Sequence, residues 1–186
     1  MDAAKHIGDE YTVDDIYALP DGQRAELIDG VWFDMGAPSS THQRISMEIS
    51  AELRNFIRDN NGDCQVFPAP FAVFLKEDGK NYLEPDISVI CDRSIVDEKG
   101  CHGAPDLIVE IVSPSTKSKD MGIKLFRYRM LGVKEYWVVD PKLQITTVYW
   151  FGPIVAETEE VNQFTFDEPI ESHLYPKLSI TLAGLL

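Results

Sequence analysis

Two short apolar runs of this chain each carry an acidic residue where a buried strand is expected. The runs are Tyr82-Leu-Glu-Pro-Asp-Ile-Ser-Val-Ile90 and Pro105-Asp-Leu-Ile-Val-Glu-Ile-Val112. Both are rich in Ile, Val and Leu and are bounded by proline and glycine signals, as is typical of strands. A bare charge in such a strand costs several kcal/mol, so Asp86 and Glu110 must be paired, protonated or bound to a cation. Two such acids on neighbouring strands predict a divalent-metal site.

The length and composition predict a globular protein. The chain has 186 residues, of which 44% are hydrophobic and 26% charged, so we expect a single domain over residues 1–186 with a flexible segment at residues 1–11. No apolar run approaches the roughly 18–20 residues that span a bilayer. The N-terminal residues also lack the apolar core of a signal peptide, and we therefore expect no membrane association.

The cysteines predict neither a zinc site nor a disulfide framework. Cys64, Cys91 and Cys101 are odd in number and contain no close Cys-x-x-Cys pair. Free thiols fit a reducing compartment, so we expect a cytoplasmic location.

The formal net charge of −14 argues against a general nucleic-acid coat protein, whose affinity comes largely from Lys and Arg on phosphates. It does not exclude a nuclease, because metal ions offset clustered acids and basic residues can gather locally. Basic residues do gather between positions 117 and 134: Lys117, Lys119, Lys124, Arg127, Arg129 and Lys134. A substrate-binding patch and a solvated helix face both explain this cluster, and the sequence leaves the choice open.

A third acid is expected on a β-hairpin over residues 25–35. Asp29-Gly30 has the residue types of a two-residue turn, in which both positions need positive φ. In that register Glu26 pairs with Phe33, and alternation places Glu26 on one face with apolar neighbours. An acid among apolar neighbours indicates a role for Glu26 other than making the surface soluble.

Two main helices are expected to flank a mixed sheet, which makes the fold α+β. Ser40-Thr-His-Gln43 resembles a capping box, and the apolar residues after it recur at helical spacing: Ile45, Ile49, Leu53 and Phe56. The second helix is expected over about 118–131, ending at Gly132. Beside the two acid-bearing runs, further strands are expected at 64–76, 135–140, 143–151, 160–166 and 177–182.

A lysine commonly completes such an acidic site by orienting the nucleophile and stabilising transition-state charge. The residue two after Glu110 points to the same side of the strand, but it is Val112. The next helix offers Lys124, at the margin of its apolar surface, where the stem can pack while the ammonium reaches Glu110. An i,i+4 salt bridge with Asp120 on the helix surface is the alternative explanation of Lys124.

Six segments, in this order, resemble the Uma-two family of restriction-type endonucleases, formerly a domain of unknown function. The resemblance extends from about residue 12 to the C-terminus. The segments are Glu26-Leu-Ile-Asp-Gly30, His42-Gln-Arg-Ile45, Glu84-Pro-Asp-Ile87, Pro105 to Thr116, Asp120 to Val133 with Lys124 and Tyr128, and Glu135-Tyr-Trp-Val-Val-Asp-Pro141. Each piece alone is weak, whereas six in order are specific.

That family belongs to the PD-(D/E)XK nuclease superfamily, and the resemblance implies a restriction-endonuclease-like αβββαβ core with additional N- and C-terminal strands. It implies Mg²⁺- or Mn²⁺-dependent hydrolysis of DNA phosphodiesters. Asp86 matches the central metal-binding aspartate, Glu110 the second acid, and Glu26 the acid of the N-terminal element. The chain departs from the superfamily pattern at Val112, where the lysine is missing, and the family resemblance offers Lys124 as the substitute.

Two more residues are candidate substrate contacts. His42 follows a helix cap and could act as a base or touch phosphate, and Ser113 lies in the loop after the second acidic strand. Asp140 before Pro141 predicts a turn. Our leading hypothesis is a DNA endonuclease, for which a homodimer is plausible. The alternatives are an inactive nuclease-fold module that binds nucleic acid, and a metal-dependent hydrolase or interaction protein whose partner is not nucleic acid.

Overall fold

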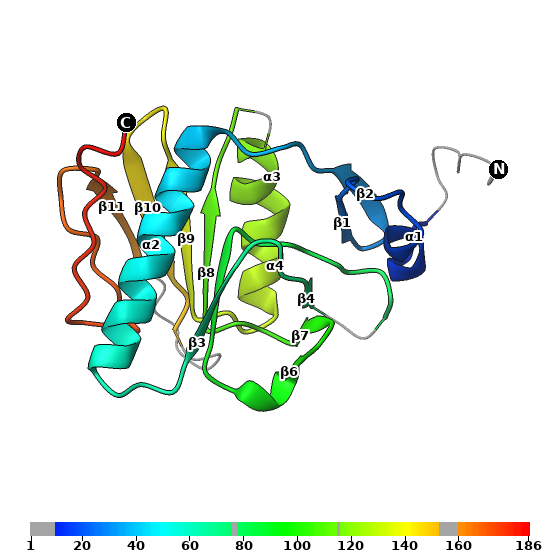
Figure 1. Cartoon of the computed structure of the whole chain (residues 1–186), viewed down its shortest axis with the longest axis horizontal. Helices are drawn as coiled ribbons and strands as arrows, with labels where there is room; N and C mark the ends of the chain where they lie inside the picture. Colours follow the sequence, from blue (N-terminus) through cyan, green and yellow to red (C-terminus); the bar gives the residue numbers. More distant parts are fainter. Residues whose placement is uncertain (1–9, 76–77, 115, 153–159) are drawn as a thin grey trace.

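A mixed six-stranded sheet forms the centre of the protein (Figure 1). The computed structural model describes residues 10–75, 78–114, 116–152 and 160–186, so most of the segment expected to be flexible lies outside the described residues. The strand order is β11-β10-β9-β8-β5-β3, with β8 and β9 parallel and the other neighbours antiparallel. The strands are β3 (Gln65–Pro68), β5 (Ile87–Ile90), β8 (Leu107–Ile111), β9 (Glu135–Asp140), β10 (Ile145–Trp150) and β11 (Glu160–Thr165).

Two helical segments complete the expected αβββαβ core. The first is α2 (Ser40–Asp59), which precedes β3, β5 and β8. The second connects β8 to β9 and is irregular, because a π-helical turn interrupts it. Its parts are α3 (Lys117–Lys119), the π-helical η2 (Asp120–Lys124) and α4 (Leu125–Met130). The predicted fold class is confirmed.

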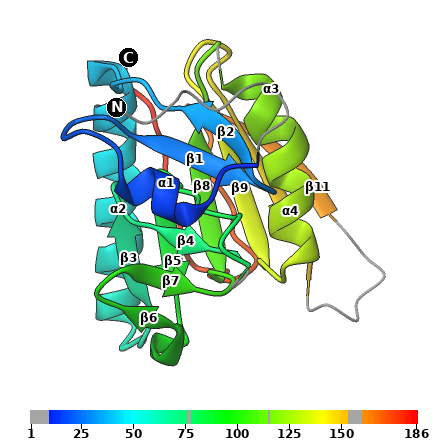
Figure 2. The same ribbon diagram turned by 90° about the vertical axis from the view of Figure 1, so that its right-hand side faces the viewer.

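The sheet lies between two layers, with α2 on one face and α4 on the other (Figures 1 and 2). Alternation along β8 accounts for this: Leu107 and Val109 pack in the core beneath α2, whereas Ile108 packs in the core beneath α4. Glu110 has the same parity as Ile108, so its side chain faces the α4 layer. The Glu110 side chain of β8 therefore points toward the irregular helical segment.

The sequence of α2 explains its position. Ser39, one residue before the expected cap, accepts a hydrogen bond from the backbone N–H of His42 at 3.1 Å and so satisfies one of the first free donors of the helix. Ile45, Ile49 and Leu53 are fully buried against the sheet, as their spacing predicts. His42 is thereby held in the first turn, at the end of the sheet.

The hairpin has the expected register. It consists of β1 (Ala25–Ile28) and β2 (Val31–Asp34), with Glu26 opposite Phe33 and a turn in which Asp29 and Gly30 have φ of 52° and 75°. Three short strands form a further small sheet in the order β4-β7-β6. They are β4 (Val73–Phe74), β6 (Val96–Asp97) and β7 (Gly100–His102), and the short helix α1 (Val13–Tyr17) lies beside the hairpin.

The predicted strand at 177–182 is wrong. Within the part of the chain that the structure describes, that segment makes one isolated bridge, between Ile170 and Ile180. Its alternating residues Leu178, Ile180 and Leu182 are nevertheless buried in the core beneath α2. Alternation here reflects burial of one side of an extended segment, which does not require a hydrogen-bonded ladder.

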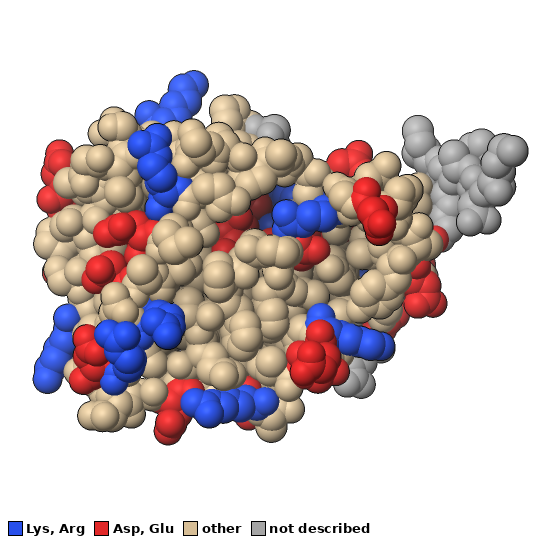
Figure 3. All heavy atoms as spheres, viewed as in Figure 1, with Lys and Arg blue, Asp and Glu red and all other residues tan. Residues whose placement is uncertain are grey.

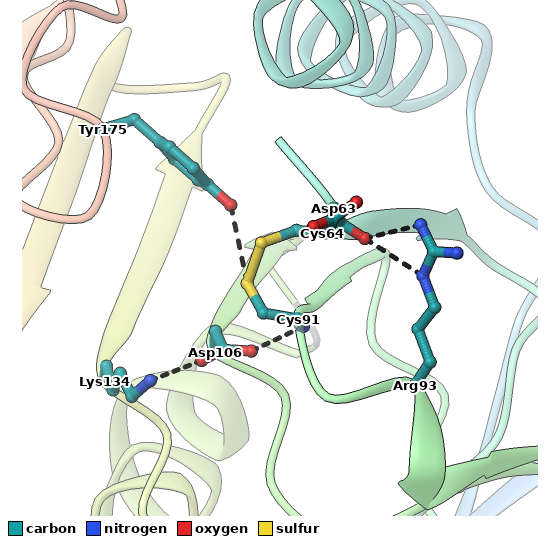
Figure 4. Close-up of a disulfide and its surroundings, with 7 residues drawn as sticks. All are labelled: Asp63, Cys64, Cys91, Arg93, Asp106, Lys134 and Tyr175. Carbon is teal, nitrogen blue, oxygen red and sulfur yellow. Dashed lines mark hydrogen bonds and ion pairs between the residues drawn. A yellow bond between two sulfur atoms is a disulfide. The ribbon is translucent and has the colours of Figure 1, made fainter. Parts of the chain in front are cut away.

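The prediction that the cysteines form no disulfide is also wrong, because Cys64 and Cys91 are disulfide-bonded (Figure 4). Gln65 pairs with Ile90 across β3 and β5, so the two cysteines face each other one position beyond that pair. Their 27-residue separation gives no sign of this, since the pairing of β3 with β5 is a tertiary feature. Cys101 is a free, buried thiol.

The surface carries both charge signs. Figure 3 shows Lys and Arg side chains interspersed with Asp and Glu on the face viewed in Figure 1, with no large basic field. Among the described helices, none is long and apolar enough to cross a membrane.

Candidate active site

One large cleft contains all six residues that the sequence singled out. It has a volume of about 1310 Å³ and lies between the start of α2, the β1–β2 hairpin, the loop after β8 and the π-helical turn. The six residues that line it are Glu26, His42, Asp86, Glu110, Ser113 and Lys124. Residues from five separate parts of the chain therefore meet in one place.

Asp86 is held rigidly at the end of the sheet. It immediately precedes β5 rather than lying inside it, and its Oδ2 atom accepts the backbone N–H of Ile111 at 2.7 Å. The same oxygen lies 3.1 Å from His42 Nε2. His42 thus contacts the central acid, and its other ring nitrogen is buried without a hydrogen-bond partner among the described residues.

Glu110 is buried on β8 and faces the helix. Its Oε1 atom accepts hydrogen bonds from Lys124 Nζ at 2.7 Å and from the Tyr128 hydroxyl at 3.0 Å. Burial raises the pKa of Glu110 well above its usual value, and the nearby Asp120, Asp86 and Glu26 carboxyls add to this, while Lys124 opposes it. The surroundings therefore disfavour a negative charge on Glu110 when no further cation is present.

The expected contact between Lys124 and Glu110 is present, and Lys124 is more deeply buried than the helix-margin position suggested. Its side chain is 3% exposed, and its Nζ lies 2.7 Å from Glu26 Oε1 and 3.5 Å from Asp120 Oδ1 as well. Burial alone lowers the pKa of Lys124, but the carboxylates around it raise that pKa well above its ordinary value. The ammonium is therefore charged and lies among three acids, Glu26, Glu110 and Asp120, which we call the acid cluster.

Glu26 is a fully buried partner of two lysines. Its Oε1 atom accepts the backbone N–H of Glu84 at 3.1 Å, and its Oε2 atom lies 2.5 Å from Lys119 Nζ. Burial raises the pKa of Glu26, but Lys124 and Lys119 outweigh burial and lower it. Glu26 is thus the ionised counter-charge that fixes both ammonium groups.

Asp120 and Lys119 are site residues that the sequence did not reveal. Asp120 is 3% exposed, so its i,i+4 pair with Lys124 is not a surface salt bridge. Burial raises the pKa of Asp120, against the effect of Lys124. A π turn is wound more loosely than an α-helix and is frequent at functional sites, and here it turns Asp120 and Lys124 together into the cleft. Helical spacing in the sequence cannot show such a turn.

Ser113 lies in the cleft wall but is engaged locally. Its hydroxyl is 3.3 Å from Thr116 Oγ1, and it accepts the backbone N–H of Thr116 at 3.2 Å. These bonds shape the turn that leads from β8 into α3. Ser113 is thereby held at the edge of the cleft.

The oxygen chemistry of the site suits a hard divalent cation, although no ready-made cage exists. Among the described residues, no three His, Cys, Asp or Glu side chains converge closely enough to hold a metal ion. The contacts of Asp86 and Glu110 described above nevertheless use one oxygen of each carboxylate, Oδ2 and Oε1. Mg²⁺ commonly binds one or two carboxylates and keeps several waters, so these two acids fit it.

Comparison with known proteins identifies the family of the chain. A sequence model of the Uma2 family, described as "Putative restriction endonuclease", matches residues 13–183. The chain is 32% identical over 106 residues to "Uncharacterized protein slr1290" of Synechocystis, a match that covers 57% of this chain and 54% of that protein, or about half of its length.

The fold also occurs in a solved structure, "a putative nuclease belonging to DUF820" from Anabaena variabilis. The TM-score is 0.72, at 23% identity, over 94% of this chain and 96% of that one. Such a likeness shows that the two proteins share the same fold. Since the family match covers nearly the whole chain, the protein belongs to the Uma2 family of restriction-endonuclease-like proteins.

Proposed function

We propose that the protein is an endonuclease that hydrolyses phosphodiester bonds of DNA with Mg²⁺ or Mn²⁺. The observation that carries the proposal is the position of Lys124, whose Nζ lies 2.7 Å from Glu110 Oε1. A lysine from the helix thus supplies, beside the second acid, the ammonium that is absent at Val112 on the strand. The family match supports the nuclease class, and the acids support the metal.

Asp86 and Glu110 would hold the metal ion, and Glu26 would contact it through water. When bound, such an ion lowers the pKa of a water molecule and offsets charge on the phosphate. The backbone N–H of Ile111 and the His42 ring keep Asp86 in place for this role. Glu110 enters the complex ionised, so metal binding releases whatever proton it holds.

Lys124 would orient the attacking water and stabilise negative charge as it develops on the phosphate. The water oxygen would form a bond to phosphorus as the bond from phosphorus to the leaving ester oxygen breaks. The water would lose one proton to solvent, and the leaving oxygen would take one proton up from solvent. Glu26 fixes the ammonium at 2.7 Å, so that the group is already positioned before substrate binds. His42 and Ser113 lie in the cleft wall, where they would contact the substrate.

A second candidate is an inactive nuclease-fold module that binds nucleic acid. The Lys124 ammonium lies between Glu26 and Glu110, at a point where a cation would otherwise be expected. This arrangement favours a site in which the lysine has replaced the metal. Such a module would bind DNA equally well in EDTA and would gain no stability from Mn²⁺.

Nicking of supercoiled plasmid DNA tests the proposal. The wild-type protein would be compared with Asp86→Ala in Mg²⁺, Mn²⁺ and EDTA, with Asp167→Ala as the control, because Asp167 is an exposed aspartate outside the cleft. Metal-dependent nicking that is lost only in Asp86→Ala supports the endonuclease. Nicking that survives in Asp86→Ala overturns the assignment.

If neither protein nicks DNA, the unfolding temperature with Mn²⁺ separates the alternatives. A rise in the wild type that is absent in Asp86→Ala indicates a real metal site with another substrate. No rise favours the inactive module. We also propose a homodimer, because two sites could cut both strands in one binding event, and linear product together with a dimeric mass in solution would support it.

A further inference from the structure

A small second pocket adjoins the cleft on the side of the β9–β10 turn. Its volume is about 180 Å³. Four residues line both the cleft and the pocket: Val112, Ser113, Pro114 and Lys142. Lys117, Asp140 and Leu143 complete it. We call these seven residues the flanking pocket. It opens beside the acid cluster without containing any of its members.

One buried carboxylate organises both cations of the flanking pocket. Asp140 ends β9 and is 8% exposed. Its Oδ2 atom accepts a hydrogen bond from Lys117 Nζ at 2.8 Å, and its Oδ1 atom accepts the backbone N–H groups of Lys142 and Leu143 at 2.9 and 3.0 Å. The turn expected at Asp140 is therefore present, and it fixes the position of the Lys142 backbone.

The remaining cations of the cleft are already committed to acids. Lys124 and Lys119 pair with Glu26, and Arg24 pairs with Glu84. Lys142 is exposed, and the described residues supply it with no ion-pair partner. With Asp140 neutralised by one lysine, the flanking pocket presents a net positive charge next to a site rich in carboxylates.

The other walls of the pocket are apolar. Val112 is buried, Pro114 is exposed, and Leu143 is 56% exposed despite its size. An apolar wall beside two ammonium groups matches a nucleotide, which presents a sugar and base on one side and a phosphate on the other. The pocket continues from the cleft in which the scissile phosphate would lie, so it is placed for the neighbouring nucleotide of the same strand.

We propose that the flanking pocket binds the nucleotide next to the scissile bond, with Lys142 and Lys117 contacting its phosphate. This inference rests on the proposed function and deepens it, since it names how an acidic protein holds a polyanion. The affinity for DNA would come from a few cations at the edge of the cleft, and the carboxylates would bind the metal.

Binding of fluorescein-labelled DNA, measured by anisotropy in EDTA so that no cleavage occurs, tests the proposal. A single strand and a duplex would be titrated at several salt concentrations with the wild type, Lys142→Gln and Lys117→Gln. Lys177→Gln is the matched control, because Lys177 is exposed and lies outside both cavities. The unfolding temperature of each variant would verify that it is folded.

Each lost phosphate contact should reduce the slope of log Kd against log salt by about 0.7 for the single strand and about 0.9 for the duplex. If the variant and the wild type bind equally at 1 M salt, the Kd of the variant at 0.1 M salt should be about five- to eightfold higher than that of the wild type. We expect this change in Lys142→Gln and Lys117→Gln and none in Lys177→Gln.

The inference fails if the wild type binds DNA and the two pocket variants match Lys177→Gln. The proposed function then stands, because binding and nicking remain. If the wild type binds neither the single strand nor the duplex, the inference fails; the nucleic-acid function fails as well if plasmid nicking is also absent.

Discussion

Replacing Lys124 by methionine should destabilise the metal-free protein strongly. Methionine keeps most of the buried stem but removes an ammonium that lies 2.7 Å from both Glu26 and Glu110 and 3.5 Å from Asp120. Removing one partner of a buried ion pair typically costs about 3–5 kcal/mol, because the other charge remains buried without compensation. For a chain of this size, each kcal/mol lowers the unfolding temperature by about 2–4 °C, so we expect a fall of about 6–20 °C.

The loss should depend on pH. Without Lys124, the pKa of Glu110 in the folded protein rises further above its value in the unfolded chain, and the pKa of Glu26 rises from its lowered value, so the folded state binds more protons. Stability of the variant therefore decreases as pH rises through these pKa values. We expect the difference from the wild type to be larger at pH 8 than at pH 5, where the carboxyl groups can be neutral.

Urea unfolding monitored by far-UV circular dichroism at both pH values measures this difference. Lys177→Met is the control, since its exposed side chain should change stability by less than about 0.5 kcal/mol. An unfolding free energy of Lys124→Met equal to that of the wild type, or a loss of equal size at pH 5 and pH 8, would refute the account of Lys124 as the counter-charge.

Three further predictions concern Glu110, its hydrogen bond with Tyr128, and the disulfide. The pKa of Glu110 is raised in the folded state, so stability falls as pH rises above the unfolded value; Glu110→Gln should flatten this dependence in urea unfolding between pH 4 and 8, and an unchanged slope would contradict the raised pKa. Tyr128→Phe removes the 3.0 Å hydrogen bond to Glu110 and should lower the unfolding free energy by about 1–3 kcal/mol, whereas no loss would mean that solvent replaces the bond. Cys64→Ser with Cys91→Ser should lower it by about 2–4 kcal/mol, and alkylation with intact-mass analysis should find two fewer reactive thiols in the wild type before reduction than after.

Local patterns were sufficient for several parts of the site. The residues of the Asp29-Gly30 turn determine the hairpin register, and the register places Glu26 beside Phe33. Apolar runs identify β5 and β8, which pair in the sheet and bring Asp86 near Glu110. These features depend on backbone preferences and on periods of two, which can be read from neighbouring residues.

The remaining features depend on tertiary contacts or irregular backbone. The disulfide requires β3 to pair with β5, and no local signal specifies that pairing. Asp120 is buried within a π-helical turn, which regular helical spacing does not reveal. Alternation over 177–182 indicates burial but does not supply a partner strand.

The central claim is that Lys124 takes the catalytic role of the lysine that is missing at Val112. Plasmid nicking in Mn²⁺ tests this claim most directly. We predict that Lys124→Met, assayed at a temperature where circular dichroism shows it folded, loses nicking while Lys177→Met keeps it. Adding Val112→Lys to Lys124→Met should restore part of the activity, because position 112 lines the cleft two residues after Glu110, just beyond the end of β8. Nicking by Lys124→Met at the wild-type rate would contradict the claim.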